Sequence, residues 1–498
     1  MSYKSFKNPV IRGFYPDPSV CRVENKYYLV ASSFQYFPGV PLFESEDLIN
    51  WKQIGNVLTR KSQLPLDGVE SSCGIFAPTI RHNNGRFYMT TTNVTGGGNF
   101  YVCTDDIYGA EWSEPIYVEQ EGIDPSFYFE NGKTYFMSNG HDKDGKSAII
   151  QSEIDIETGK LLSEPRALWS GTGGRYLESP HLYKINNCYY LMAAEGGTEY
   201  GHMVTYARSE NLWGPYEPYA ENPVLTNRNL GGYPIQGIGH ADLVDDINGN
   251  RWIFHLGFRQ IHRWLTFHHL GREVFLMPVD FHDDGWFTAG ENGTTTEEVS
   301  TDKIPGEIIQ HFKNIFTFQN IESYEWRFLR NPDAENYIFG ENSLKIKSSA
   351  DTLDSIGSPS FIGLHQKEFV MELSVRITAN DGEAGVTIYM DENHHYDLSF
   401  NGAAVKLKLN IGDIKQEKVS TPANEKETLL KIKSDAINYE FFCGDTSLGK
   451  AQTRYLSSEV AGGFTGVVIG LYSQYGEQEK FNEFRDFKLE YKQYNPLT

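Results

Sequence analysis

The sequence predicts an all-β protein, a five-bladed β-propeller followed by a β-sandwich. Helical periodicity is scarce along the 498 residues, and short strands bounded by Gly, Asn and Asp turns recur throughout. One strand–turn–strand pattern returns five times in roughly the first 290 residues. The rest of the chain alternates apolar and polar side chains in longer strands, which predicts a second, separate β domain.

Each copy of the repeat starts with a short residue pattern, forms a strand, turns at Asn and Gly, and ends in a second strand rich in Tyr, Phe or Trp. The copies read DPSVCRVENKYYLVASS from 17, APTIRHNNGRFYMTTT from 77, DPSFYFENGKTYFMSN from 124, ESPHLYKINNCYYLMAAE from 178 and HADLVDDINGNRWIFHLG from 240. Five copies, each of about 50 to 60 residues, match a five-bladed propeller with four strands in each blade.

The first residues of the repeats are expected to meet, because the first strand of each propeller blade lines the central axis. Asp17, Asp124, Glu178 and His240 should therefore face one another. Prolines on both sides of Asp17 restrict the backbone and remove a hydrogen-bond donor, which holds its carboxylate at the mouth of the axis. A lone Asp-Pro pair merely begins a turn, but DPS twice and ESP once at matched positions favour a site.

The second domain follows a polar stretch, TTTEEVSTDKIPGE (294–307). We place the propeller at residues 1–300, a linker at 301–315 and the second domain at 316–498. Strands with Gly, Asn and Asp turns and no notable helix are typical of a jelly-roll, concanavalin-like β-sandwich. Such sandwiches often bind carbohydrate, but the fold alone implies no function. The predicted strands are 369–377, 384–390, 404–411, 428–434, 466–472 and 484–491.

Charge and composition restrict the classes of binding partner that we expect. The chain has 44 basic and 66 acidic residues, a formal charge of −22, which repels nucleic acid and anionic membranes, so we expect neither as a partner. Aromatic residues make up 14% of the chain, an excess that suits β structure and also sites that stack on sugars.

The cysteines and the N-terminus bear on location. Five cysteines without CxxC spacing indicate neither a disulfide framework nor a zinc ribbon, and fit buried thiols in a reducing compartment. The N-terminus, MSYKSFKNPVIRG, lacks an apolar signal region, and no run approaches the roughly 18 apolar residues of a transmembrane helix. We therefore expect a cytoplasmic protein.

Carboxyl groups that surround one pocket suggest acid/base chemistry on a neutral substrate, since no Ser-His-Asp or metal-ligand pattern accompanies them. Glycoside hydrolysis needs one carboxyl that gives a proton to the leaving oxygen and another, ionised, that acts on water or on the anomeric carbon. A third carboxylate near the acid raises the pKa of that acid, so its proton is still present near neutral pH.

Several ordered motifs resemble glycoside hydrolase family 43, in the branch of β-xylosidases and α-L-arabinofuranosidases with a C-terminal β-sandwich. They are GFYPDPSV, SSFQYFPGVPLFESEDLINW, GIDPSFYF, LESPHLYK, AAEGGTEYGHMVTYARS, QGIGHADLV and HHLGREVF. The resemblance implies an inverting mechanism, with Asp17 as the general base, Glu178 as the general acid and Asp124 as the residue that orients the acid and tunes its pKa. Inversion predicts that the Asp17 and Glu178 carboxyls lie roughly 6.5 to 9.5 Å apart, and about 5 Å would favour retention.

The resemblance also implies binding residues, each with a plainer alternative. Arg272, in LGRE, would bond the hydroxyls of the terminal sugar, and a surface ion pair is the alternative for such an arginine. His240 would support the arginine or coordinate an ion through water, unless it is a structural histidine. We expect no required cofactor and no directly bound metal, and the resemblance allows a structural calcium ion near His240.

Aromatic residues would form the walls of the sugar pocket. Phe464, in GGFTG of the sandwich, would close the site and enforce exo-action, with a core position as its alternative. Phe76 stands where many xylosidases of this branch carry Trp, which leaves the sugar preference open. The remaining predicted binding residues, for which a core role competes, are Phe34, Phe127, His202 and Thr205.

Three other patterns are explained without a site. GTGGR (171–175) lacks the Lys-Ser/Thr and the helix of a phosphate loop, and DKDG (142–145) lacks the distal Glu of a calcium loop. The histidine pairs at 268–269 and 394–395 lack further ligands for zinc.

We therefore predict an exo-acting β-xylosidase that takes xylo-oligosaccharides or arabinoxylo-oligosaccharides, with side activity on α-L-arabinofuranosides. An α-L-arabinofuranosidase is the rival enzyme, and a non-catalytic carbohydrate-binding protein is the rival from another class. A homo-oligomer is one option, because intracellular relatives are often dimers or tetramers.

Overall fold

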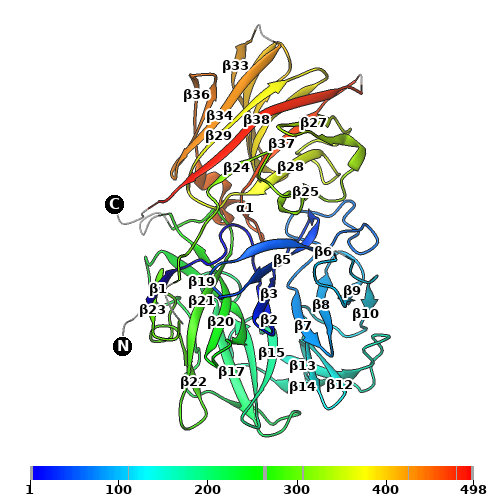
Figure 1. Cartoon of the computed structure of the whole chain (residues 1–498), viewed down its shortest axis with the longest axis vertical. Helices are drawn as coiled ribbons and strands as arrows, with labels where there is room; N and C mark the ends of the chain where they lie inside the picture. Colours follow the sequence, from blue (N-terminus) through cyan, green and yellow to red (C-terminus); the bar gives the residue numbers. More distant parts are fainter. Residues whose placement is uncertain are drawn as a thin grey trace.

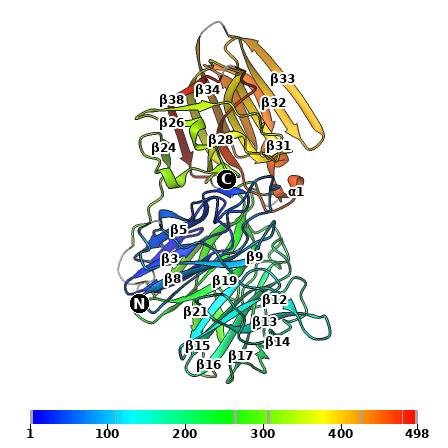
Figure 2. The same ribbon diagram turned by 90° about the vertical axis from the view of Figure 1, so that its right-hand side faces the viewer.

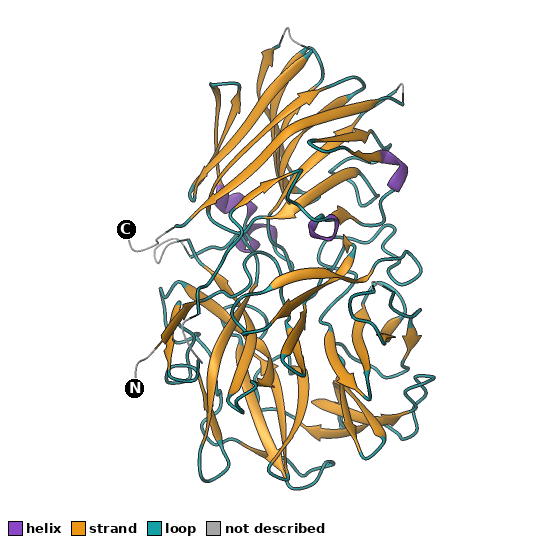
Figure 3. Cartoon of the chain, viewed as in Figure 1, coloured by secondary structure: helices purple, strands orange, loops and turns teal. Residues whose placement is uncertain are grey.

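The computed structural model describes residues 4–109, 111–261, 266–304, 308–423, 426–477 and 479–494. Figure 1 shows a propeller, coloured blue to green, below a sandwich coloured yellow to red. Strands dominate both domains, and the helices in the described residues are short (Figure 3). The predicted all-β propeller and sandwich are confirmed.

Five four-stranded antiparallel sheets make up the propeller within the described residues. The first two are β2 (Ser19–Val23), β3 (Lys26–Val30), β5 (Gly39–Ser45), β6 (Lys52–Leu58), and β7 (Thr79–Asn83), β8 (Arg86–Asn93), β9 (Gly98–Thr104), β10 (Ile116–Tyr117). The third and fourth are β11 (Ser126–Glu130), β12 (Lys133–His141), β13 (Ser147–Ile154), β14 (Arg166–Trp169), and β15 (Glu178–Ile185), β16 (Cys188–Glu195), β17 (Met203–Ser209), β18 (Glu217–Pro218). The fifth is β19 (Ile235–Asp245), β20 (Arg251–Arg259), β21 (Glu273–Phe281), β22 (Phe287–Ala289).

The first strands of these sheets form a closed ring around the axis. β2 contacts β7, β7 contacts β11, β11 contacts β15, β15 contacts β19, and β19 returns to β2. The hairpins between first and second strands turn at the predicted residues. Asn84 and Gly85 both have positive φ (50° and 82°), as do Asn131 and Gly132 (52° and 76°), which matches the twist that two-residue hairpins need.

The sandwich consists of two packed sheets whose inner faces form one apolar core. β29 alternates strictly, and its inward residues Met371, Leu373, Val375 and Ile377 lie in this core. One sheet follows the order β26 (Tyr337–Phe339), β27 (Ser343–Lys347), β38 (Phe481–Lys492), β29 (Val370–Thr378), β34 (Glu427–Asp435), β35 (Asn438–Cys443), β36 (Thr446–Gln452), with β24 (Ile315–Thr317) paired to β38. The other follows β28 (Ser360–His365), β37 (Val468–Gln474), β30 (Glu383–Asp391), β31 (His394–Phe400), β32 (Ala404–Ile411), β33 (Ile414–Pro422).

The two domains join through strands and buried ion pairs. β4 (Tyr36–Phe37) of the propeller pairs with β25 (Phe328–Leu329), and Arg259 binds Glu368 of the sandwich at 2.9 Å. In both perpendicular views the short helix α1 (Ser458–Ala461) lies at the junction (Figures 1 and 2). The contact between the two domains brings the loop after α1 to the mouth of the propeller axis.

The chain termini of the propeller pair with each other, since β1 (Lys4–Lys7) runs antiparallel to β23 (Glu298–Thr301). The predicted linker, 301–315, starts on the last residue of β23 and ends on the first residue of β24. Residues 305–307 within it lie outside the described residues.

Candidate active site

A small pocket at the propeller axis gathers most of the predicted site residues. Its volume is about 60 Å³, whereas clefts elsewhere on the molecule reach about 370 to 480 Å³, so chemistry rather than size distinguishes it. It is lined by Asp17, Phe34, Phe76, Ala77, Ile123, Asp124, Glu178, Thr198, His202, His240, Arg272 and Phe464.

Asp17 and Asp124 precede the first strands of their blades, and His240 lies within β19, where the strand register shifts between Gly239 and Ala241. Their φ angles are 57°, 55° and 47°, in the left-handed region that Asp tolerates better than most residues. The flanking prolines predicted a restricted backbone, and the structure adds this left-handed turn. The turn directs each side chain into the axis instead of along the strand.

Glu178 departs from this register by one residue. In its blade Ser179 has the left-handed backbone (φ 55°) and precedes Pro180, as Asp17 precedes Pro18. The sequence alignment of ESP with DPS therefore needs a shift of one position. Glu178 still lines the pocket, because it begins β15 next to that turn.

Asp17 is placed to stay ionised. Its Oδ1 accepts a hydrogen bond from Arg272 Nη1 at 2.8 Å, and its Oδ2 accepts one from the Ser32 hydroxyl at 2.5 Å. Burial alone would raise the pKa of Asp17, but the charge of Arg272, then His240 and the Ser32 hydrogen bond, hold that pKa below its usual value.

Glu178 is placed to keep its proton. Burial, followed by the negative charge of Asp17, raises the pKa of Glu178 to about 7, although Arg272 opposes the shift. The acid therefore remains substantially protonated near neutral pH, while Asp17 is a carboxylate. Two carboxyls of one pocket thus differ in charge, which is the condition for acid/base work.

Asp124 lies beside both of these groups. Burial, then the charges of Glu178 and Asp17, raise its pKa well above the usual range. Its Oδ2 accepts a hydrogen bond from the Ser179 N–H at 3.1 Å, which fixes the backbone next to Glu178. We expected the Asp124 charge to raise the pKa of the acid, whereas burial and Asp17 dominate the shift at Glu178.

Arg272 connects the base to the pocket wall. Besides Asp17, its Nη1 donates to the Thr198 hydroxyl at 2.8 Å, and its guanidinium lies 5.0 Å from the centre of the Phe464 ring. His240 Nδ1 lies 3.9 Å from Asp17 Oδ1 and 3.7 Å from Asp124 Oδ2. These contacts place a cation against the predicted base, and a histidine between that base and the predicted orienting carboxyl.

His202 is a neutral wall of the pocket. Burial lowers the pKa of His202 to about 3, and its Nδ1 lies 3.1 Å from the carbonyl oxygen of Gly237. Gly239 permits this packing, because a Cβ there would lie 2.3 Å from the imidazole ring.

Three phenylalanines form the apolar wall, and one of them comes from the sandwich. The ring centres of Phe34, Phe76 and Phe464 are 5.4 to 5.7 Å apart. The Phe464 N–H donates to the Ser72 hydroxyl at 2.8 Å, which ties the loop after α1 to the propeller. The second domain therefore completes the pocket.

Two predicted residues lie elsewhere. Phe127 is buried between sheets, with its ring 5.3 Å from Tyr101 and 5.6 Å from Phe136, because its strand directs it away from the axis. Thr205 points to Glu195, and its hydroxyl donates a hydrogen bond to Glu195 Oε1 at 2.9 Å. Neither side chain lines the pocket.

Sequence reasoning did not name Ser32, Thr198 or Ile123 as site residues, and it placed Ala77 at the axis only as the first residue of a repeat. Ile123 precedes the carboxyl of its repeat, so the repeat itself could have indicated it. Ser32 and Thr198 follow second strands of their blades, within the quoted motifs SSFQYFPGVPLFESEDLINW and AAEGGTEYGHMVTYARS, which gave them no role.

The described residues hold no group of three or more His, Cys, Asp or Glu side chains that could bind a metal ion. The calcium ion near His240 stays a prediction. All five cysteines are free thiols. Among the described residues, no helix has the length and apolar character to cross a membrane.

The chain resembles known proteins over nearly its whole length. Residues 6–287 match the family model "Glycosyl hydrolases family 43", and residues 317–490 match "Beta xylosidase C-terminal Concanavalin A-like domain". The chain is 39% identical to the "Non-reducing end alpha-L-arabinofuranosidase BoGH43B" of Bacteroides ovatus, over 97% of this chain and 94% of that protein. It is 38% identical to a "Xylosidase/arabinosidase" of Butyrivibrio fibrisolvens, over 94% and 95%. The solved structure of a xylan beta-1,4-xylosidase from Bacillus halodurans C-125 superposes with a TM-score of 0.89 at 28% identity, covering 98% of this chain and all of that one (100%).

Proposed function

Because the chain belongs to glycoside hydrolase family 43, we propose that it is an inverting, exo-acting β-xylosidase that releases D-xylose from the non-reducing ends of short β-1,4-xylo-oligosaccharides. The observation that carries the proposal is one axial pocket in which Asp17 has a lowered pKa and Glu178 a pKa of about 7. The chain is a glycoside hydrolase, and the sugar, the stereochemistry and the roles of the residues are what we propose.

In the proposed step, Asp17 takes a proton from a water molecule whose oxygen attacks the anomeric carbon. The bond from that carbon to the leaving oxygen breaks, and Glu178 gives its proton to this oxygen. Asp124 holds the backbone beside Glu178 through the Ser179 N–H. The product has inverted configuration, and this requires a separation of about 6.5 to 9.5 Å between the Asp17 and Glu178 carboxyls.

Exo-action is supported by the small size of the pocket and by the sandwich residue in its wall. Phe464 of the sandwich, with Phe34 and Phe76, walls a volume of about 60 Å³, which favours a single terminal sugar over an internal segment of a chain. The fork of Arg272, held by Asp17 and Thr198, is positioned to bond paired hydroxyls of that sugar.

An α-L-arabinofuranosidase is the second candidate function. The names of the relatives cover both activities, and Phe76 lines the pocket where many xylosidases of this branch have Trp. A non-catalytic sugar binder is disfavoured, because binding alone gives no reason to hold one carboxyl protonated beside an ionised one.

We also propose a cytoplasmic location, supported by the free cysteines, and no required cofactor. A structural calcium ion near His240 and a homo-oligomeric state remain proposals. Chelator treatment followed by activity and melting measurements tests the first, and light scattering tests the second.

Parallel assays test the function. We expect p-nitrophenyl β-xyloside and xylobiose to be hydrolysed faster than p-nitrophenyl α-L-arabinofuranoside, and proton NMR to show α-xylose as the first product. The reverse rate order supports the arabinofuranosidase, and β-xylose as first product contradicts inversion. No turnover of any substrate supports the binder.

A further inference from the structure

The loop before Glu178 (residues 171–177) is held by a buried carboxylate that the proposed mechanism does not use. Glu195, the last residue of β16, is 0% exposed. Its Oε1 accepts hydrogen bonds from the Thr172 N–H at 2.8 Å and the Thr172 hydroxyl at 3.1 Å, and its Oε2 accepts one from the Gly174 N–H at 2.7 Å. A buried carboxylate that accepts hydrogen bonds thus organises the loop backbone.

The loop wraps closely around this carboxylate. A Cβ at Gly171 would lie 2.9 Å from Oε1 of Glu195, and one at Gly174 would lie 2.8 Å from Oε2. Gly196, which directly follows β16, donates a hydrogen bond from its N–H to the Arg175 carbonyl at 2.7 Å. The sequence GTGGR, which resembles a phosphate loop, therefore surrounds an internal carboxylate.

Glu178 needs such support because it begins an irregular strand. It pairs with Ala194, but the register shifts between Glu178 and His181, and Ser179 has a left-handed backbone. The regular ladder consequently fixes this residue poorly. On its C-terminal side the Ser179 N–H binds Asp124, and on its N-terminal side the loop binds Glu195.

We propose that Glu195 is a positioning residue of the reaction, which holds loop 171–177 so that the Glu178 carboxyl reaches the leaving oxygen. The inference rests on the proposed role of Glu178 as the general acid. A misplacement of about 1 Å in such a group costs on the order of 100-fold in rate.

Glu195→Gln tests the inference with little change of shape. If the amide oxygen stays on Thr172, the amide NH₂ faces the Gly174 N–H, and that hydrogen bond is lost. We expect kcat on xylobiose to fall about 10- to 100-fold, and kcat on p-nitrophenyl β-xyloside, whose leaving group needs little protonation, to fall less than about threefold. Glu383→Gln is the matched control, a buried glutamate of the sandwich bound to Lys408 at 2.9 Å, and it should show no dependence on the leaving group.

Equal losses on both substrates, or no loss on xylobiose, would overturn the inference. Should Glu195→Gln fail to fold by circular dichroism, Thr172→Val removes one exposed donor to Glu195 and should still lower xylobiose turnover selectively, by about two- to fivefold. A wild type without glycosidase activity would refute the proposed function. This inference alone would be refuted if the loss of activity depended on the leaving group in Glu178→Ala but not in Glu195→Gln.

Discussion

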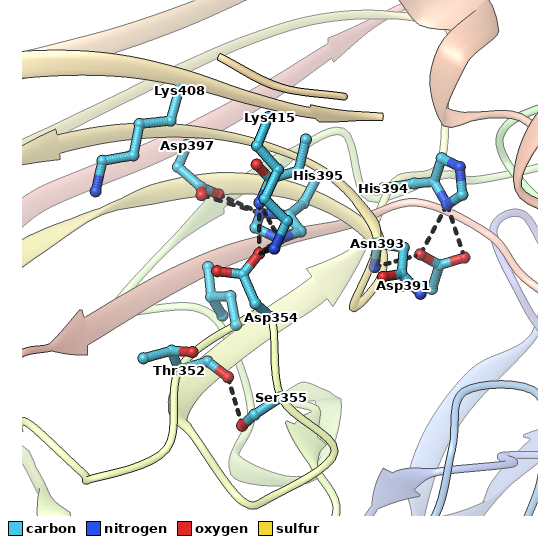
Figure 4. Close-up of polar contacts among 12 residues, drawn as sticks. Thr352, Asp354, Ser355, Asp391, Asn393, His394, His395, Asp397, Lys408 and Lys415 are labelled. Carbon is cyan, nitrogen blue, oxygen red and sulfur yellow. Dashed lines mark hydrogen bonds and ion pairs between the residues drawn. The ribbon is translucent and has the colours of Figure 1, made fainter. Parts of the chain in front are cut away.

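The propeller axis and the outer face of the sandwich both bury charged groups, but they combine them in opposite ways. On the axis, carboxyls from separate blades face each other around Arg272. In the sandwich, His395 lies between the carboxylates of Asp397 at 2.9 Å and Asp354 at 3.2 Å, and Lys415 binds Asp354 at 3.0 Å (Figure 4).

The pKa shifts follow this difference. In the sandwich, burial opposes the charge of His395, but Asp397 and Asp354 raise its pKa to about 9, and the hydrogen bond from His395 is the main cause that lowers the pKa of Asp354 to about 2. On the axis, burial and a neighbouring carboxylate raise the pKa of Glu178 to about 7. Paired opposite charges are stable across the physiological range, whereas crowded like charges leave one proton available near neutral pH.

Asp17→Ala should produce the largest loss of activity. The variant lacks the carboxylate that deprotonates water, so we expect kcat/KM to fall by about 10³- to 10⁴-fold on xylobiose and on activated aryl xylosides alike. Steady-state kinetics on both substrates measures this. A variant that kept full activity on the aryl substrate would show that Asp17 is not the base.

Glu178→Ala should lower the activity on xylobiose far more than the activity on p-nitrophenyl β-xyloside. We expect a loss of about 10³-fold on xylobiose and less than about tenfold on p-nitrophenyl β-xyloside, since only the poor leaving group needs a proton. Equal losses on both would contradict the role of Glu178 as the acid. The contrast with Asp17→Ala in the same assay distinguishes the two carboxyls.

The pH dependence should show the shifted acid directly. Glu178 works protonated, so kcat/KM on xylobiose should decrease above about pH 7, by tenfold per pH unit. Asp17 works ionised and its pKa is lowered, so the acidic limb should lie below the ordinary range of an aspartate. An alkaline limb near pH 4.5, the usual value for a glutamate, would refute the arrangement. The activated substrate is the control, because its profile should lack the alkaline limb.

The sequence predicted the ring of carboxyls because the repeat places Asp17, Asp124 and Glu178 at comparable points of their blades. It failed for Phe127, because closeness in sequence to Asp124 does not fix the direction of a side chain, and along β11 Phe127 packs on Tyr101 and Phe136. It also failed for Thr205 and overlooked Glu195, because an acidic residue at the end of a strand looks solvent-exposed until the loop that covers it is known. In the sandwich, alternation predicted β29 and β34, but not β31, which is buried along its whole length and reads as HHYDLSF.

His395→Gln should have the smallest effect on activity and a clear effect on stability. The variant leaves Asp397 and Asp354 without their shared cation, so the melting temperature should fall at pH 6, while kcat/KM on xylobiose stays within about twofold. The folded pKa of about 9 exceeds the unfolded value of 6.5, so the stabilisation is complete below pH 6.5 and disappears as the pH rises through 9. The difference in melting temperature between wild type and variant should therefore shrink between pH 6.5 and 10.

His394→Gln is the matched control, because the neighbouring histidine binds Asp391 at 2.9 Å and not the Asp397–Asp354 pair (Figure 4). It should lower the melting temperature less. If folded His395→Gln lost xylobiose turnover to an extent similar to Glu178→Ala, the contrast between the catalytic axis and the structural cluster of the sandwich would be wrong. The charged cluster of the sandwich would then act on the axial pocket through the hairpin that joins β30 to β31. In that hairpin Glu392 accepts a hydrogen bond from the Ser71 hydroxyl at 2.5 Å, and the next residue, Ser72, accepts one from the Phe464 N–H.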